Sequence, residues 1–230
     1  MIEFNGFRWK DISSEKMGLI VDKLPPITRA EERVEKKIVQ GRDGHLTFSD
    51  GTFESYTKQV EFHVDNREID TLSSWLCGSG QVVFGNQGDR YYKARIINQI
   101  DFNYILPILH KGVVIFDVQP FGYLFEGEKT ITITKNNSEI LGLGTYPSKP
   151  YFKVYGSGDI TLTVNSNDVL IKGVNGYVEI DSELDIFYKD TTSMEDKVTG
   201  NCPTLLPSIN NISWVGNVTK VEIIPRWCSL

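Results

Sequence analysis

The sequence predicts a mainly β chain in two parts, an N-terminal β-fold with one α-helix and a projecting hairpin, followed by a β-sandwich. Three observations predict this. Apolar and polar residues alternate along several segments of the first half, as half-buried strands require. One segment, residues 65–78, has helical periodicity instead. In the second half, short apolar runs recur between stretches rich in glycine and asparagine, a spacing typical of sandwiches.

Length and composition fit a globular chain of two domains. The 230 residues are 40% hydrophobic and 23% charged, enough for two domains of roughly 100–130 residues each. Acidic residues outnumber basic ones by 30 to 24. A phosphate backbone selects clustered lysines and arginines, so we expect no nucleic-acid partner.

The cysteines and the apolar segments indicate in which compartment the chain is made and whether it spans a membrane. Cys77, Cys202 and Cys228 are scattered and odd in number, which favours synthesis in a reducing cytoplasm over a disulfide framework. The N-terminus has no apolar signal-peptide core. The apolar runs fall short of the roughly 18 residues that a membrane span needs, so we expect no membrane partner.

Residues 29–39, RAEERVEKKIV, combine conflicting preferences. Intrinsic propensity favours a helix. Two prolines precede the segment, however, and a glycine turn follows it at once. Val34 and Ile38 also share one face of a strand. We therefore predict an extended arm or hairpin strand.

The next stretch, GRDGHL at residues 41–46, has two glycines that resemble those of a phosphate loop. Such a loop needs a following helix and a lysine beside a serine or threonine, whereas this one continues into a β pattern. We predict a tight turn here and a second turn at Ser49-Asp50-Gly51. Two turns this close predict a hairpin with a projecting tip, a shape suited to gripping a neighbouring subunit.

Further strands follow in order. Strict alternation at residues 60–64 predicts a half-buried strand. Residues 81–84 and 91–97 predict two strands around the turn GNQGD. The mostly apolar segment 111–118 predicts a strand buried on both faces.

Between these strands, DNREIDTLSSWLCG at residues 65–78 predicts a short amphipathic helix. Asp65 and Glu68 have the spacing of a capping box, and Gly78 is placed for a left-handed C-terminal cap. The apolar face is formed by Ile69, Leu72 and Leu76, with Trp75 beside them.

A passage rich in glycine and proline within residues 126–150 predicts the domain boundary. We place the two domains at 1–128 and 129–230. After it, PYFKVYG, DITLTVN, VLIKGV and YVEID predict four strands, separated by turns at GSGD, NSND and GVNG. The last strand is predicted at residues 218–224.

The residues predict no catalytic, cofactor or metal site. A Gly-x-Ser-x-Gly elbow is absent from the sequence, and the histidines lack metal-ligand spacing. Alternating carboxylates have the chemistry of a glycosidase pair or a weak calcium site, but like charges on one strand face repel, so we predict a solvated rim. These acids are Glu179, Asp181, Glu183 and Asp185.

Aromatic residues of the second half keep one alternative function open. Exposed rings can stack on sugars, although a sandwich also needs large side chains in its core. Tyr188 and Trp214 are the candidate contacts of a carbohydrate-binding module for cell-wall sugars.

Several stretches, in this order, resemble the distal tail protein (Dit) family of long-tailed (siphovirus) bacteriophages, and the resemblance covers nearly the whole chain. In the first half they are PPITRAEERVEKKIVQGRDGHLTFSDGTFESYTKQVEFHV and WLCGSGQVVFGNQGDRYYKARI. In the second half they are GSGDITLTVN, GYVEIDSE, GNCPTLLPSINNISW and VEIIPRW.

The resemblance implies a structural component of the tail tip or baseplate. The N-terminal half would form a homo-hexameric ring at the distal end of the tail in the virion, and the C-terminal half would be a galectin-like β-sandwich. The ring would join the tail tube protein to the tail-associated hub protein, and the sandwich would face the receptor-binding protein. No reaction, cofactor or metal is implied. Some relatives carry carbohydrate-binding insertions, for which this compact chain has no room.

Carried onto this sequence, the resemblance places the subunit contact in the hairpin, where an unpaired strand edge is a template for pairing. The residues concerned are Val34, Ile38, Gly41, Arg42, Asp43, Gly44, Asp50 and Gly51.

Overall fold

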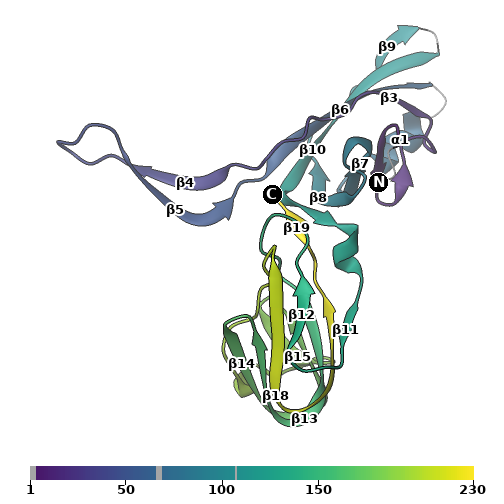
Figure 1. Cartoon of the computed structure of the whole chain (residues 1–230). Coiled ribbons are helices and arrows are strands. Elements are labelled where there is room, and N and C mark those ends of the chain that lie inside the picture. Colours follow the sequence, from purple (N-terminus) through teal and green to yellow (C-terminus); the bar gives the residue numbers. More distant parts are fainter. Residues whose placement is uncertain (1–3, 66–68, 107) are drawn as a thin grey trace. The chain divides into compact units, whose positions relative to one another are not determined.

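The alternating pattern of the sequence is realised in a computed structural model, which describes residues 4–65, 69–106 and 108–230 (Figure 1). The prediction of a mainly β chain with one α-helix is confirmed for these residues. Two compact units divide between Gly122 and Tyr123, with Leu230 grouped in the first. The division into domains 1–128 and 129–230 stays a prediction.

The first unit contains a sheet and an independent hairpin. The sheet has the strand order β2-β1-β7-β8-β10-β6-β3, and β9 pairs with β10 off this path. Its elements are β1 (Phe7–Trp9), β2 (Ile12–Ser13), β3 (Leu19–Lys23), β6 (Tyr56–Asp65), α1 (Ile69–Trp75), β7 (Ser79–Phe84), the 3-10 turn Gly85–Gln87, β8 (Arg90–Ile96), β9 (Asn103–Leu106) and β10 (Leu109–Leu124). The hairpin consists of β4 (Glu32–Lys37) and β5 (Leu46–Phe53).

Helix α1 covers the sheet with the face that the sequence predicts. Leu72, Trp75 and Leu76 are buried. The indole N–H of Trp9 donates to the carbonyl of Trp75 (3.1 Å), and the indole N–H of Trp75 donates to the carbonyl of Trp9 (3.2 Å). These reciprocal bonds fasten the helix to β1 and satisfy both buried donors.

The helix prediction is confirmed over the described residues Ile69–Trp75. Strand β6 ends at Asp65, the residue predicted to cap the helix. Glu68 of the predicted capping box lies outside the described residues. Gly78 has a φ of +71°, as a left-handed residue after the helix requires.

Strand β10 corrects one prediction. Residues at alternate positions, Val114, Phe116 and Val118, are fully buried, whereas the residues between them are half-buried. The segment 111–118 is therefore buried on one face. Its apolar character arises because the second face is partly covered.

The second unit is one curled sheet of long strands. The order is β11-β18-β13-β14-β15-β16, with β12 beside β18 and β17 beside β14. The elements of this unit are the 3-10 turn Phe125–Glu128, β11 (Ile131–Ile133), β12 (Ser138–Leu141), β13 (Tyr151–Val164), β14 (Asn167–Asp181), β15 (Ile186–Lys189), β16 (Thr192–Ser193), the 3-10 turn Glu195–Lys197, β17 (Val198–Thr199) and β18 (Ile209–Ile224). The short strand β19 (Cys228–Ser229) is not part of this sheet and pairs with β10.

The predicted turns at GSGD and GVNG are wrong, because both sequences lie inside continuous strands. The four predicted strands of residues 150–181 are two, β13 and β14, which meet at one true turn around Asn165. The pairing register shifts between Gly158 and Ile160. The glycines therefore bend the strands instead of ending them, as β-bulges do.

Pairing partners change at the bend, so the sheet has two halves. On one side of it β18 pairs with β12 and β14 with β17; on the other side β18 pairs with β11 and β14 with β15. Buried residues from both halves of β13, Phe152 and Val154 before the bend and Leu162 and Val164 after it, belong to one core cluster. The two halves therefore face each other across this core, which is the layered arrangement of a sandwich. Its galectin-like character stays a prediction.

The bend gives a matched test of backbone strain. Gly158 and Gly216 both have positive φ, +80° and +108°. A Cβ on Gly158 meets nothing within 4 Å, whereas one on Gly216 lies 2.5 Å from the backbone oxygen of Asp159. We expect Gly158→Ala to cost about 1 kcal/mol of unfolding free energy and Gly216→Ala roughly 1–3 kcal/mol more. Urea unfolding of both variants checks this; equal losses would contradict the assignment of a close backbone approach at Gly216.

Candidate functional site

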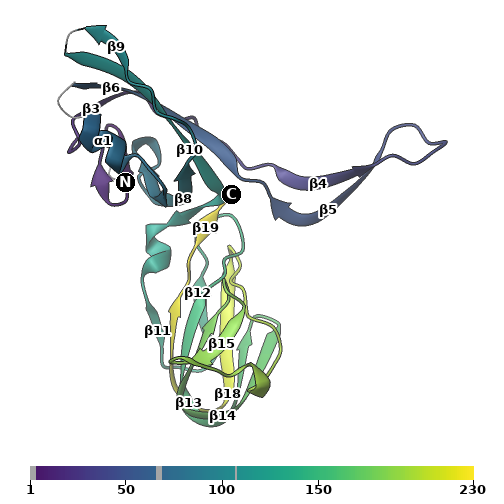
Figure 2. The ribbon, with the colours of Figure 1, turned by 180° about the vertical axis from the view of Figure 1, so that it is seen from behind.

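The hairpin of β4 and β5, here called the arm (residues 32–53), is the main candidate for an interaction site. It forms a two-stranded sheet of its own, and all six residues of β4 are exposed. Both views show the two strands running side by side away from the other strands of the first unit (Figure 1, Figure 2). An isolated two-stranded hairpin is marginally stable in water. The arm is therefore expected to be completed by another surface.

The structure confirms the extended prediction for this segment over its helical propensity. Residues 32–37 form a strand because they pair with β5, for example Glu35 with Phe48 and Lys37 with Leu46. The exposed fractions of apolar side chains on the arm are high: 41% for Val34, 83% for Ile38 and 53% for Phe48. Apolar side chains on an open hairpin favour burial against a protein.

The predicted tight turn lies at the tip of the arm. Gly41 and Gly44 have φ values of +82° and +78°, and Arg42 and Asp43 between them are exposed. The tip leads into strand β5 and not into a helix. This geometry is that of a turn and lacks the helix N-terminus on which a phosphate loop depends.

The second predicted turn, at Asp50 and Gly51, is wrong. Both residues lie inside β5. Val34 is paired with Ser49, and Glu32 is paired with Phe53. Between these two pairs β5 has more residues than β4, so β5 forms a β-bulge. The Asp50 carboxylate accepts the backbone N–H of Thr52 at 2.9 Å, a local bond that fixes the kink.

The base of the arm is held by polar and aromatic contacts within the first unit. Arg33 makes two hydrogen bonds to the Glu54 carboxylate, at 2.7 and 3.2 Å. The rings of Phe53 and Phe121 meet edge to face with centroids 5.8 Å apart. The arm therefore leaves the sheet from a defined anchor.

Lys58 anchors strand β6, which follows the arm, and no sequence pattern predicts this role. Its side chain is 1% exposed, and Nζ donates to the carbonyl of Pro26 at 3.0 Å and to Gln87 at 3.4 Å. Burial, and next the charge of Arg90, lower the pKa of Lys58 to about 8. The position of Lys58 could have indicated its burial, because residues 58 and 60 lie on the same face of a strand and Val60 is buried.

Three aromatic rings surround the ammonium group. Nζ of Lys58 lies 5.5 Å from the ring centroids of Tyr56 and Phe84 and 5.1 Å from that of Tyr92. Such rings attract a cation through their negative faces. They offset part of the cost of burying the charge, which explains how a lysine is accommodated on the inward face of β6.

In the second unit, the predicted solvated rim of acids is wrong for two of its members. The Asp181 side chain is 9% exposed and pairs with Arg226 through bonds of 2.6 and 2.9 Å. Glu179 accepts the hydroxyl of Tyr151 at 2.5 Å. These carboxylates are paired and half-buried or buried, so repulsion within the strand is offset by partners on other strands.

The candidate sugar contacts have different environments. Trp214 is 7% exposed and belongs to the core cluster, so it is a core residue and its ring is not a surface for stacking. Tyr188 is half-buried on β15. A sugar contact by Tyr188 alone stays a prediction, which binding to a cell-wall glycan array with Tyr188→Ala as control tests.

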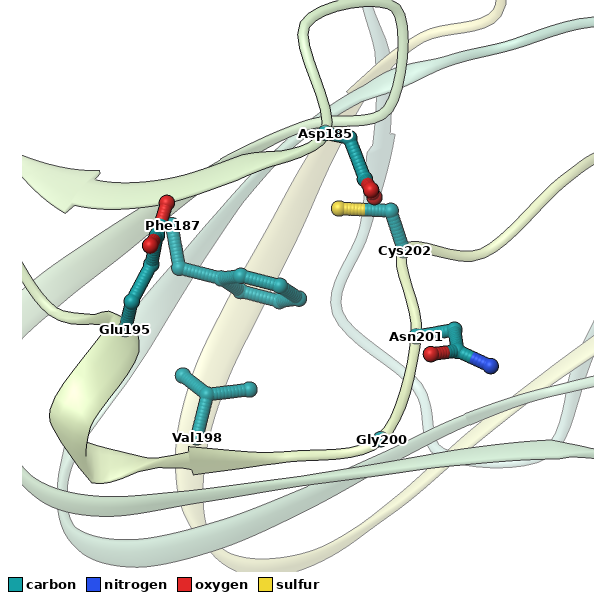
Figure 3. A pocket seen from close by; sticks show the side chains of 7 residues that line it. All are labelled: Asp185, Phe187, Glu195, Val198, Gly200, Asn201 and Cys202. Atoms are coloured by element: carbon teal, nitrogen blue, oxygen red, sulfur yellow. The ribbon is translucent and has the colours of Figure 1, made fainter.

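A small pocket of about 180 Å³ lies near β15 and β17 (Figure 3). Figure 3 shows Asp185 and Cys202 together at one end and Val198 at the other. Burial, followed by the hydrogen bond and charge of Asp185, raises the pKa of the Cys202 thiol to about 12. The thiol therefore stays protonated near neutral pH and is a poor nucleophile.

Two kinds of site are not found in the described part of the chain. Its His, Cys, Asp and Glu side chains form no group of three or more that could hold a metal ion. Among the same residues, no helix has the length and apolar character to cross a membrane.

Comparison with known proteins identifies the fold. The chain superposes on the crystal structure of SPP1 Dit with a TM-score of 0.76, over 95% of this chain and 97% of that chain, at 13% sequence identity. That protein is described as a paradigm of the hub adsorption apparatus in phages that infect Gram-positive bacteria. No protein-family model matches the sequence, and no curated protein matches it. The chain therefore has a Dit-like fold, as the sequence resemblance predicts.

Proposed function

We propose that this protein is a structural component of a bacteriophage tail tip. The observation that carries the proposal is the match of the whole chain, both units included, to a phage hub protein. A match over 95% of the chain leaves little of it to form an additional domain. The role is one of assembly, and we assign it no reaction and no cofactor.

In this proposal six copies close into a ring at the distal end of the tail. The arm supplies the contact between neighbours, because its exposed apolar side chains and open strand edges are suited to pairing. A contact between different surfaces on identical copies is heterologous, and it gives a ring when the rotation closes. Val34, Ile38 and the tip residues 41–44 contribute to this contact, and Asp50 and Gly51 set the bend of the arm.

The ring joins the tail tube protein on one side to the tail-associated hub protein and receptor-binding protein on the other. Support for these partners is the name of the matched protein, a hub of an adsorption apparatus. The backbone and apolar contacts of such an assembly need no catalytic group. This role accounts for a chain whose exposed features are an arm and strand edges.

Shortening the arm tests the proposal. Glu35 and Phe48 are directly paired, so residues 36–47 can be replaced by an Asn-Gly turn that closes a shorter hairpin. We expect annular particles for the unaltered protein in negative-stain electron micrographs and loss of at least nine in ten of them for this variant, because the exposed side chains of Ile38 and Val39 at the end of the arm are gone.

A matched control removes exposed apolar surface elsewhere. Leu141 on β12 is 67% exposed, and Leu141→Ser should leave the particles unchanged. Absence of annular particles from the unaltered protein would overturn the proposed function, and their survival without the arm tip would overturn the role of the arm.

A further inference from the structure

A second exposed apolar segment lies in the first unit, on the hairpin of β9 and β10. Exposed fractions are 66% for Tyr104, 44% for Ile105, 54% for Leu106 and 67% for Ile108. We call these four residues the apolar tip. Four exposed apolar residues within five positions are unusual on a protein surface and indicate contact with another protein.

The apolar tip also offers an open strand edge. Strand β9 pairs with β10, through Leu106 opposite Leu109 and Tyr104 opposite His110, and the described residues place no strand on its other side. An open edge with apolar side chains promotes pairing with a further strand. The segment is therefore suited to receive a strand and not merely an apolar side chain.

The arm and the apolar tip lie at opposite ends of one ladder. Strands β6 and β10 pair from Tyr56 opposite Val118, at the base of the arm, to Asp65 opposite Leu109, beside β9. From Tyr56 to Asp65 the strand advances nine residues, a span of about 30 Å at the usual rise of a strand. A head-to-tail contact between copies requires two different surfaces at opposite ends of the protomer.

The charges of the two surfaces are complementary. Beyond the Glu35–Phe48 pair the arm carries three cationic side chains, none of which has an ion pair within the described residues: Lys36, Lys37 and Arg42. They are accompanied by the single acid Asp43.

The other end of the ladder carries four acids against two lysines, Lys23 and Lys111, of which Lys111 pairs with Glu61 at 3.0 Å. The acids are Asp22, Glu61, Asp65 and Asp101. Asp22 contacts His63, which is paired opposite Lys111, and Asp65 is paired opposite Leu109. Opposite potentials of this kind steer two surfaces together and fix their orientation.

We propose that the arm of one copy docks on the apolar tip of the next, with an arm strand adding to the open edge of β9. This inference rests on the proposed ring and names the surface that receives the arm. Ile38 and Phe48 pack on Tyr104, Ile105 and Ile108. Lys36, Lys37 and Arg42 face the acids at the end of the ladder.

Disulfide trapping tests the contact. Two differently tagged variants, Ile38→Cys and Ile105→Cys, are co-expressed, both in a Cys77→Ser background because Cys77 is an exposed thiol. Tyr104→Cys and Ile108→Cys replace Ile105→Cys in parallel to allow for register. After mild oxidation of purified rings, we expect a cross-linked species carrying both tags for at least one of the three pairs. Its yield should exceed by at least tenfold that of a control with Ile38→Cys and Leu141→Cys.

The outcomes separate this inference from the proposed function. Rings without any such cross-link, or rings in which Ile38→Cys links to its own copies, would overturn the docking on the apolar tip and leave the ring standing. Absence of rings from the unaltered protein would overturn both.

A substitution provides an independent readout. Ile105→Asp places a charge in the apolar tip, and we expect it to lower the ring fraction in light scattering at least tenfold. Leu141→Asp, at an apolar position of the second unit that is more exposed than Ile105, should leave that fraction unchanged. An unchanged ring fraction for Ile105→Asp, with normal circular dichroism, would contradict the docking.

Discussion

Replacing Arg226 by methionine is expected to lower the unfolding free energy by about 3 kcal/mol, because it strands a buried carboxylate. Asp181 is 9% exposed, and two bonds of 2.6 and 2.9 Å join it to the guanidinium of Arg226. Methionine keeps most of the aliphatic bulk and removes the charge. Urea unfolding followed by circular dichroism measures the loss.

A double variant separates the pair from its surroundings. Asp181→Asn retains an oxygen for the backbone N–H of Glu183, which Asp181 accepts at 3.0 Å. Combined with Arg226→Met, it should recover roughly half or more of the lost stability, because no charge is left unpaired. A loss below about 0.5 kcal/mol for Arg226→Met would place the pair among weak surface ion pairs and contradict this account.

The same pair predicts behaviour in acid. Burial acts to raise the pKa of Asp181, but the hydrogen bonds and charge of Arg226, with two backbone donors, hold it below its ordinary value of 3.8. A carboxyl group with a lowered pKa in the folded state stabilises the fold above pH 4 and loses that contribution as the pH falls further. Arg226→Met should shift the acid unfolding midpoint to higher pH.

Raising the pH from 7 to 9.5 is expected to stabilise the first unit through Lys58. Its pKa is lowered from 10.5 to about 8, chiefly by burial. Between these values the unfolded chain binds the proton more tightly than the folded one, so the unfolding free energy rises with pH. Between pH 7 and 9.5 the unfolding free energy rises by at most about 3 kcal/mol, since a shift of one pKa unit corresponds to about 1.4 kcal/mol.

Lys58→Met is the control for this titration. Methionine fits an apolar site and has no proton to lose, so the variant should show no comparable rise between pH 7 and 9.5. Unfolding of both proteins at one concentration, followed by the fluorescence of the tryptophans, compares them. Equal slopes for the two proteins would show that another group causes the pH dependence.

The alternation of apolar and polar residues predicts those elements that bury one face and expose the other. Residues 60–64 and the helix face of Leu72 and Trp75 are of this kind, because their periods of 2 and 3.6 distinguish strand from helix. The strand at residues 32–37 was also predicted, because flanking prolines and glycines outweighed helical propensity.

Glycine clusters were misinterpreted where pairing over long range decides the outcome. GSGD, GVNG and Asp50-Gly51 have the residues of turns, but partner strands continue past them, so they became bends and a bulge. A bulge and a turn use the same left-handed backbone. The sequence alone does not say which of the two a partner strand will enforce.

Ion pairs between distant residues and buried charges also cannot be predicted from local sequence patterns. The local pattern predicts a solvated Asp181 because its partner, Arg226, is 45 positions away. Lys58 was missed because an inward lysine breaks the apolar alternation.

The central claim is that copies of this 26.1 kDa chain close into a ring through the arm. Native mass spectrometry of the purified protein tests it most directly. The account predicts one dominant closed species of six copies, which falls to monomer when residues 36–47 are replaced by a two-residue turn. A monomer for the unaltered protein, or an open-ended series of masses without a dominant closed species, would contradict it.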